Sequence, residues 1–331
     1  MRSILQPPIP QDTAEFPPNF GPRFMVTVDT EEEFDWAKPI DRVSHGLKHV
    51  AQIARFQSFC EAHGVAPVYL VDWPIATSPE AAETLRGPVA RGEAEIGVQL
   101  HPWVSPPFEE ELTERNTFAG NLPPALEREK LLRLRDAIDS NFAATPLMYR
   151  AGRYGLGPAT AGLLVDAGIA VDSSVRSKFD YSAGGGPDYR PHPLTPYWVD
   201  TNRRLLELPL TTVFSGLLRG FGDAIYPRQW RLPASRALMA RLGLLERIPL
   251  TPEGVSVEEA LRGVDVALEM GLPLLVFSFH SPSLDVGHTP YVQSAAELDA
   301  LYDWWGRIFA ELARRNVAPV GISGVLEAVI R

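Results

Sequence analysis

The sequence contains a single cysteine, Cys60, among its 331 residues. One thiol cannot form an intramolecular disulfide or a cysteine-based zinc site. The chain also has no excess of basic residues, because 31 Lys and Arg stand against 41 Asp and Glu, with a formal net charge of -10. Phosphate neutralisation needs clustered cations. We therefore expect no nucleic acid and no anionic membrane surface as the main partner.

Long apolar runs are also missing, and no stretch is long enough for a signal peptide or a membrane span. We accordingly expect a cytoplasmic protein. Residues 1–20 carry five prolines and are interpreted as a flexible, proline-rich N-terminal arm. Apolar residues make up 45% of the chain and charged residues 22%, which is typical of a globular enzyme. The length fits one α/β barrel or two smaller domains.

Short apolar stretches alternate with stretches of helical periodicity along most of the chain. The strand-like stretches are 24–28, 65–71, 95–100, 147–150, 169–172, 205–210 and 274–279. This alternation predicts βαβ crossovers and a parallel sheet, covered on both faces because its strands are almost wholly apolar. Two long excursions, around 178–197 and 212–250, interrupt the pattern. We expect them to shape or cover a binding cleft.

Polar, chemically capable residues follow the predicted strands. In a parallel barrel or sheet, the carboxyl ends of the strands carry the chemistry. Those ends hold, in chain order, Asp29 with Glu31, Asp72, His101, Arg150, Asp172 and His280. Carboxylates, imidazoles and an arginine converging on one mouth are the composition of a metal-assisted hydrolase.

The residue types suggest roles at this mouth. Glu31 and His101 are typical oxygen and nitrogen ligands of a divalent ion. Asp29 lies two residues before Glu31, so both can face the same side of an extended backbone, one as base and one as ligand. His280 could donate a proton to a leaving group, and Arg150 could hold Asp29 ionised.

Aromatic and further histidine residues are more ambiguous. Trp73, Trp103 and Tyr154 offer flat faces for stacking against a sugar ring, although aromatics at such positions more often serve packing. His45 and His49 have the spacing of a helical metal chelate. A solvated helix face explains that spacing as well, and His49 is kept as a reserve ligand because it follows the acidic loop closely.

Four ordered motifs resemble those of the polysaccharide deacetylases, in particular the WalW-like branch. They are 26–31 (VTVDTE), 95–102 (EIGVQLHP), 149–155 (YRAGRYG) and 277–282 (FSFHSP). The resemblance implies a distorted (β/α) barrel with seven strands and long loop insertions, formed as a single domain by residues 21–331. It also implies a metal-dependent hydrolase that removes acyl groups from N-acetylated carbohydrate or a glycan precursor.

The resemblance also implies roles for individual residues. Asp29 matches the general base and Glu31 a carboxylate ligand of a divalent ion, for which zinc is expected. His101 matches the histidine of the second motif, and Arg150 the arginine that positions the base. Asp172 falls in the region of the aspartate that adjusts the acid, and His280 matches that acid.

Two departures from the family pattern leave other functions open. The first histidine of the second motif is replaced by Gln99, so Asp72 or His49 would have to complete the metal site. Glu31 stands where many members have Asp. Two alternatives to a deacetylase therefore stay open. The protein could be a catalytically degenerate relative that binds carbohydrate, or a hydrolase of a small non-peptide amide.

Overall fold

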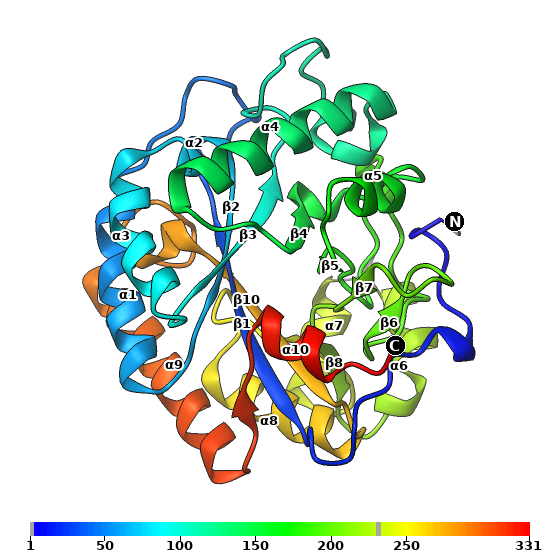
Figure 1. Cartoon of the computed structure of the whole chain (residues 1–331). Coiled ribbons are helices and arrows are strands. Elements are labelled where there is room, and N and C mark those ends of the chain that lie inside the picture. The colour runs from blue at the N-terminus through cyan, green and yellow to red at the C-terminus, as the bar shows by residue number, and fades with distance from the viewer. Residues whose placement is uncertain (1–2, 230–232) are drawn as a thin grey trace.

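The computed structural model describes residues 3–229 and 233–331. Seven parallel strands form a curled wall in the order β10-β1-β2-β3-β4-β5-β7 (Figure 1). They are β1 (Arg23–Thr30), β2 (Val68–Val71), β3 (Glu95–Leu100), β4 (Met148–Ala151), β5 (Val171–Asp172), β7 (Leu206–Glu207) and β10 (Leu274–His280). Two short strands extend this sheet: β6 (Tyr197–Trp198), antiparallel to β7, and β11 (Ala318–Pro319), beside β1. The expected seven-stranded (β/α) barrel is confirmed.

Alternation along β1 decides which side chains face the barrel interior. Phe24, Val26 and Val28 belong to the larger hydrophobic cluster, between the sheet and the surrounding helices. Met25 belongs to the smaller cluster inside the barrel. Because side chains on a strand alternate between its two faces, Asp29 faces the interior with Met25. The interior therefore becomes polar toward the carboxyl ends of the strands.

Helices cover the outside of the wall (Figure 1). They are α1 (Val50–Ala62), α2 (Trp73–Ala76), α3 (Pro79–Ala90), α4 (Pro124–Phe142), α5 (Thr160–Asp166), α8 (Val257–Glu269) and α9 (Ala295–Arg314). The last helix, α10 (Ile322–Ala328), packs instead against the interior cluster at one end of the barrel. Ser78 and Ser294 cap α3 and α9, and Ser256 forms a capping box with Glu259 at the start of α8. Trp305 of α9 is fully buried between α1 and β10.

Single turns of 3-10 helix connect several elements. They are η1 (Pro10–Asp12), η2 (Arg115–Thr117), η3 (Ala119–Asn121), η4 (Gly152–Tyr154), η5 (Ser182–Gly184), η6 (Arg219–Phe221) and η7 (Ser281–Leu284). No helix in the described part of the chain is long and apolar enough to cross a membrane.

The barrel is distorted where β7 meets β10. Instead of a regular ladder, Thr211 bridges the gap, with its N–H donating to the carbonyl of Val276 and its Oγ1 accepting from the N–H of Val276. The N–H of Ser278 donates to the carbonyl of Leu250, 3.2 Å away. These bonds close the wall and bring the loop after Leu250 next to the end of β10.

The excursion over 212–250 forms a separate two-stranded hairpin. It comprises β8 (Thr212–Ser215), α6 (Gly222–Gln229), α7 (Pro233–Arg241) and β9 (Glu246–Pro249), with β8 and β9 antiparallel. Residues 230–232 of this excursion lie outside the described residues. The other excursion, 178–197, contains η5 and ends at β6.

The N-terminal segment contacts the barrel, while its expected flexibility stays a prediction. Ile4 is buried in the larger hydrophobic cluster. Bridges join Thr13 to Tyr197 and Glu15 to Ile330. Residues 1–2 lie outside the described residues.

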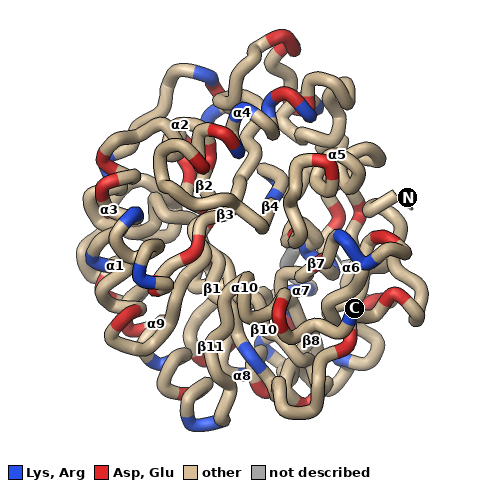
Figure 2. Tube along the Cα trace, viewed as in Figure 1, with Lys and Arg blue, Asp and Glu red and all other residues tan. Residues whose placement is uncertain are grey.

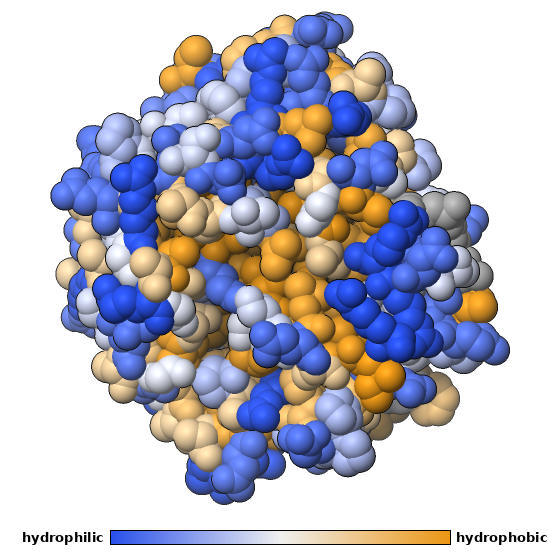
Figure 3. All heavy atoms as spheres, in the orientation of Figure 1, coloured by the Kyte–Doolittle hydropathy of each residue, from blue (hydrophilic) through white to orange (hydrophobic). Residues whose placement is uncertain are grey.

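Charged and apolar residues are distributed unevenly over the face of the molecule that the figures show. Basic and acidic positions alternate around the outer helices, while a basic position on β4, which contains Arg150, lies within the ring of strands (Figure 2). Apolar residues gather toward the middle of the face that Figure 3 shows. There α10 contributes Ile322 and Val325 to the interior cluster, which helps to close this end of the barrel.

Candidate active site

The pairing of Asp29 with Arg150 lies at the end of β1. Nη1 of Arg150 donates to Oδ1 of Asp29, and both side chains are buried. The guanidinium also donates from Nη2 to Oγ1 of Thr27, at 2.9 Å, and from Nε to the carbonyl of Ser173, at 2.8 Å. A charge-assisted hydrogen bond from a buried guanidinium fixes the orientation of its carboxylate partner. Arg150 thus holds Asp29 in place.

An imidazole stands beside this carboxylate. Nε2 of His280 lies 3.8 Å from Oδ2 of Asp29. Nδ1 of His280 lies 2.6 Å from Oε2 of Glu253, whose Oε1 accepts from the N–H of His280 and from the hydroxyl of Ser283. Burial lowers the pKa of His280, but the carboxylate of Glu253, with Glu31 and Asp29, outweighs burial and raises the pKa to about 10. The ring is therefore protonated near neutral pH.

Glu253, and not Asp172 as the family resemblance implies, is the carboxylate that contacts the imidazole of His280. Val171 faces the barrel interior, so Asp172 points to the opposite face of β5. There Oδ1 of Asp172 accepts from the hydroxyl of Ser174, and its carboxyl interacts with that of Glu207. Burial and the neighbouring Asp172 raise the pKa of Glu207 well above its usual range. The contacts of Asp172 among the described residues therefore belong to a buried carboxyl pair outside the cavity.

Glu31, His101 and Gln99 form a group of potential metal ligands. Oε2 of Glu31 lies 3.4 Å from Nε2 of His101 and accepts from Nε2 of Gln99, 3.1 Å away. Two ligands that each lie about 2.1 Å from a tetrahedral zinc ion are about 3.4 Å apart. Oε1 of Gln99 is buried and has no hydrogen-bond partner among the described residues. The unpaired oxygen and the ligand spacing both fit a cation at this position.

Burial raises the pKa of Glu31 to about 8, against the opposing effect of His280 and His101. A carboxylate buried in this way needs positive charge to stay ionised. An imidazole carries positive charge only when it is protonated. A divalent ion would supply positive charge directly, so the electrostatics of Glu31 also fit a bound cation.

A second cluster with metal-ligand chemistry lies behind the imidazole of His101. Ligand atoms of Glu32, Asp72 and His101 all lie within 4.8 Å of one another. These groups already satisfy one another, since Nδ1 of His101 lies 2.9 Å from Glu32, and the N–H of Glu32 donates to Asp72. Glu32 also accepts from the indole of Trp103. A carboxylate at Nδ1 orients the ring and leaves Nε2, which faces Glu31, available to bind a metal.

The expected metal role of Asp72 has a competing structural role. Its Oδ1 caps α2 by accepting from the N–H of Ile75, and its Oδ2 accepts from the N–H of Glu32. Burial, followed by the neighbouring Glu32, raises the pKa of Asp72 well above its usual range. Asp72 does not line the cavity described below. We therefore favour the Glu31 group as the metal site over the Asp72 cluster.

The reserve histidines lie outside this ligand group. His49 is buried with Nδ1 2.9 Å from Glu33 and Nε2 2.8 Å from the hydroxyl of Ser281. Ser281 in turn accepts from the N–H of Glu31. His49 therefore supports the backbone of the acidic loop. His45 is exposed on the surface.

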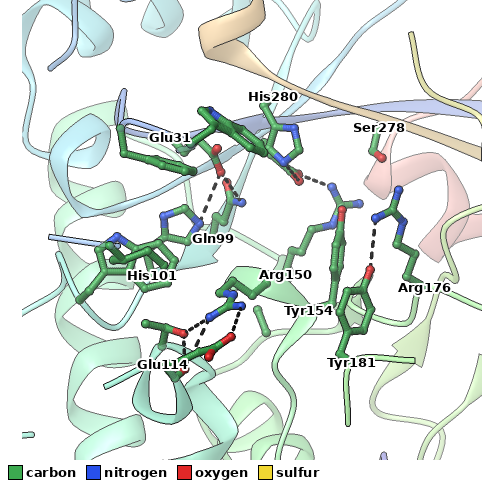
Figure 4. A pocket seen from close by; sticks show the side chains of 18 of the residues that line it. Glu31, Gln99, His101, Glu114, Arg150, Tyr154, Arg176, Tyr181, Ser278 and His280 are labelled. Atoms are coloured by element: carbon green, nitrogen blue, oxygen red, sulfur yellow. Dashed lines mark hydrogen bonds and ion pairs between the residues drawn. The ribbon is translucent and has the colours of Figure 1, made fainter. Parts of the chain in front are cut away.

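A cavity of about 710 Å³ joins the acidic loop, His101, Arg150 and His280, a size typical of small-molecule sites. Figure 4 shows Glu31, Gln99 and His101 on one side of it and Arg176 with Tyr181 on the other. The remaining aromatic residues of its lining are Phe34, Trp36, Trp103, Tyr154 and Tyr291.

The three predicted stacking residues fall in different places. Tyr154 lines the cavity, directed there by a turn in which Arg153 and Tyr154 both have positive φ angles, of 54° and 60°. Trp103 also lines it, but one face lies against His101, with ring centroids 4.2 Å apart. Trp73 packs against the hydrophobic core and does not line the cavity.

Comparisons with known proteins agree with this architecture. The structure resembles that of a probable polysaccharide deacetylase from Pseudomonas aeruginosa PAO1, with a TM-score of 0.50 and 14% identity, covering 96% of this chain and 91% of that one. The chain has the polysaccharide deacetylase fold. No family model and no curated protein matches the sequence. The WalW-like branch stays a prediction.

A second solved structure also resembles this chain in its fold. A 4-alpha-glucanotransferase from Thermococcus litoralis matches with a TM-score of 0.52 and 12% identity, covering 93% of this chain and 40% of that one. At such identities the likeness concerns the fold alone. The function has to be argued from the residues of the cavity.

Several cavity residues escape the sequence motifs. Glu253 follows β9, which is part of the hairpin excursion and not of the parallel wall, so no strand-end pattern points to it. Trp36 lies in the loop after the acidic residues, with its ring centroid 5.3 Å from that of His280. Of its aromatic neighbours, Phe34 lies two residues earlier in the same loop, and Tyr291 comes from the distant loop before α9. The proximity of Trp36 to the acidic motif is the one sequence signal among these.

Proposed function

We propose that this protein is a metal-dependent hydrolase that removes an acyl group, in particular acetyl, from an N-acylated carbohydrate. The observation that carries the proposal is the juxtaposition of Asp29, bound by Arg150, with a protonated His280 in the cavity. Hydrolysis of an amide needs a base for the attacking water and an acid for the departing amine. The two side chains supply these in adjacent positions.

The chain's own residues would divide the reaction between them. Asp29, oriented by Arg150, accepts a proton from the water that attacks the acyl carbonyl. His280, held protonated by Glu253, gives a proton to the amine nitrogen as the carbon–nitrogen bond breaks. The aromatic lining, including Trp36 and Tyr154, offers apolar faces to the sugar rings.

A divalent ion would be held by Glu31 and His101, with Oε1 of Gln99 as a further oxygen ligand. When bound, it would polarise the acyl carbonyl and stabilise the negative charge that develops on its oxygen. Zinc suits a mixed nitrogen and oxygen ligand set and is the expected metal.

The test is acetate release from N-acetylated oligosaccharides by the zinc-loaded protein. Replacing Asp29 by Asn should lower the rate at least about a hundredfold, the usual contribution of a general base. Asp35→Asn, in the exposed part of the same loop, is the matched control and should retain the activity. Equal rates for Asp29→Asn and the control would remove Asp29 from the base role.

Gln99 favours one further candidate, a carbohydrate-binding relative without a tight metal site, because an amide oxygen binds zinc less well than an imidazole. Metal analysis of protein purified without chelator separates the two. Protein that stays metal-free in the presence of zinc, yet binds sugar, would be such a binder. Including a small non-peptide amide among the assayed substrates tests the remaining alternative.

A further inference from the structure

The charged residues that line the cavity are almost all paired. Each of the following has an oppositely charged partner within 4 Å: Asp29 with Arg150, Glu31 with His101, Glu253 with His280, Arg153 with Glu114 and Lys38 with Asp35. Among the described residues, Arg176 is the one charged lining residue without such a partner.

The surroundings of Arg176 are aromatic. Its guanidinium carbon lies 4.0 Å from the ring centroid of Phe179 and 5.2 Å from that of Tyr154. Nη1 donates to the hydroxyl of Tyr181 at 3.1 Å. Burial raises the pKa of Tyr181, so its hydroxyl stays neutral and does not neutralise the guanidinium. Aromatic faces attract a cation without replacing a counter-charge.

Arg176 also has unused hydrogen-bonding capacity on the cavity side. A guanidinium has five N–H donors, and one of its hydrogen bonds is found among the described residues. Its remaining nitrogens are accessible to solvent, and Arg176 is a lining residue of the cavity. Arg247 adds positive charge nearby, since its guanidinium carbon lies 3.6 Å from the same Phe179 ring.

The position of Arg176 relates it to the reacting end of the cavity. Tyr154 stands between Arg150 and Arg176 in Figure 4, and His280 lies between the Glu31 group and Arg176. A ligand that reaches from the Glu31 group to Arg176 would therefore pass Asp29 and His280. The cavity volume of about 710 Å³ leaves room for a sugar between them.

We propose that Arg176, with Tyr181, binds an anionic substituent of the substrate, so that the preferred substrate is an N-acylated sugar carrying a carboxylate or a phosphate. This inference rests on the proposed function for the nature of the substrate. A planar guanidinium with free donors matches the oxygens of either group in a bidentate manner. Because no carboxylate of the described residues pairs with Arg176, that position is left to the ligand.

The test measures binding without turnover, by calorimetry on the full-length zinc-loaded protein. The probes are glucose, glucose 1-phosphate, glucose 6-phosphate and glucuronate, which carry no acyl group to hydrolyse. At least one anionic probe should bind about tenfold or more tightly than glucose, as expected for a charge-assisted hydrogen-bonded pair. The preferred probe distinguishes phosphate from carboxylate.

Three variants test whether Arg176 causes the preference for an anionic probe. Arg176→Gln should reduce the ratio of the two dissociation constants to about one, whereas Arg176→Lys, which keeps the charge, should retain most of it. Arg153→Gln is the matched control, since it removes a cavity guanidinium that is paired with Glu114, and the ratio should persist. Thermal unfolding of each variant checks that it is folded.

Two results would overturn the subsite: no anionic probe preferred by the wild-type protein, or a preference that survives in Arg176→Gln. A preference that disappears equally in Arg153→Gln would also overturn it, because the effect would then reflect general charge. The hydrolase proposal fails separately, if the subsite is found but no matching N-acetylated sugar releases acetate.

Discussion

Asp29 and His280 stand opposite each other in register on the neighbouring strands β1 and β10, although they come from opposite ends of the chain. Nε2 of His280 and Oδ2 of Asp29 are 3.8 Å apart, which is too long for a hydrogen bond. Each group has its own strong partner instead, Arg150 for Asp29 and Glu253 for His280. The two partners hold a base and an acid side by side without letting them neutralise each other.

The first prediction concerns the pH dependence set by Glu253. His280 acts as an acid only while protonated, so kcat/KM should fall as the pH rises through its pKa, which Glu253 raises. Replacing Glu253 by Gln removes the main raising influence. The alkaline limb of the pH–rate profile should then move down by about one pH unit or more. Ser283→Ala, which removes a hydroxyl donor to Glu253 but keeps its charge, should move the limb less.

Much of this arrangement follows from the sequence, because parallel strands bring their carboxyl ends together. Asp29, Glu31, His101, Arg150 and His280 all meet at one cavity for that reason. They form the part of the site that a strand-end pattern can predict.

The positions of Asp172 and Glu253 could not be predicted from the strand-end pattern. Asp172 also ends a strand, but its neighbour Val171 faces the interior, and the twofold alternation of β5 turns Asp172 to the other face. A strand of two residues gives little sequence on which to judge that alternation. Glu253 reaches the site through the hydrogen bond from Ser278 to Leu250, which closes the barrel beside β10. Such a tertiary contact has no local sequence signature.

The second prediction distinguishes the two possible metal sites. If the ion lies at the cavity, Glu31→Gln should weaken zinc binding by at least about a hundredfold, since it replaces a charged ligand. Asp72→Asn should weaken it much less, because Asp72 contacts the helix α2 and Glu32. Competition with a chromogenic chelator measures both constants. A larger loss in Asp72→Asn would instead place the ion among Glu32, Asp72 and His101.

The third prediction concerns Gln99 as a weak ligand. Gln99→His would replace an amide oxygen by an imidazole at a position whose side chain already contacts Glu31. Zinc affinity should rise about tenfold or more, because imidazole is the better ligand. The same chelator competition measures the change, with Gln99→Ala as the comparison that removes the oxygen. Equal affinities for the histidine and alanine variants would show that residue 99 does not contact the metal.

The last prediction concerns stability and lies outside the cavity. Glu127 of α4 is buried, and its carboxylate accepts a hydrogen bond from the hydroxyl of Thr160. Burial raises its pKa to about 7, despite the opposing effect of that hydrogen bond. The unfolded chain has the ordinary value near 4.5. Between these values the folded protein binds a proton that the unfolded chain has released, so the contribution of Glu127 to stability falls as the pH rises from 4.5 through 7.

Glu127→Gln removes this titration while keeping an oxygen that can accept from Thr160. Relative to the wild type, the free energy of unfolding of the variant should therefore rise between pH 5 and pH 8, by roughly 2 kcal/mol. Urea denaturation at the two pH values measures the difference. The control is Glu129→Gln on the same helix, whose carboxylate is exposed and paired with Arg133. Because an exposed pair contributes little, its stability difference should be nearly independent of pH. A flat difference for Glu127→Gln as well would show that Glu127 is ionised in the folded protein.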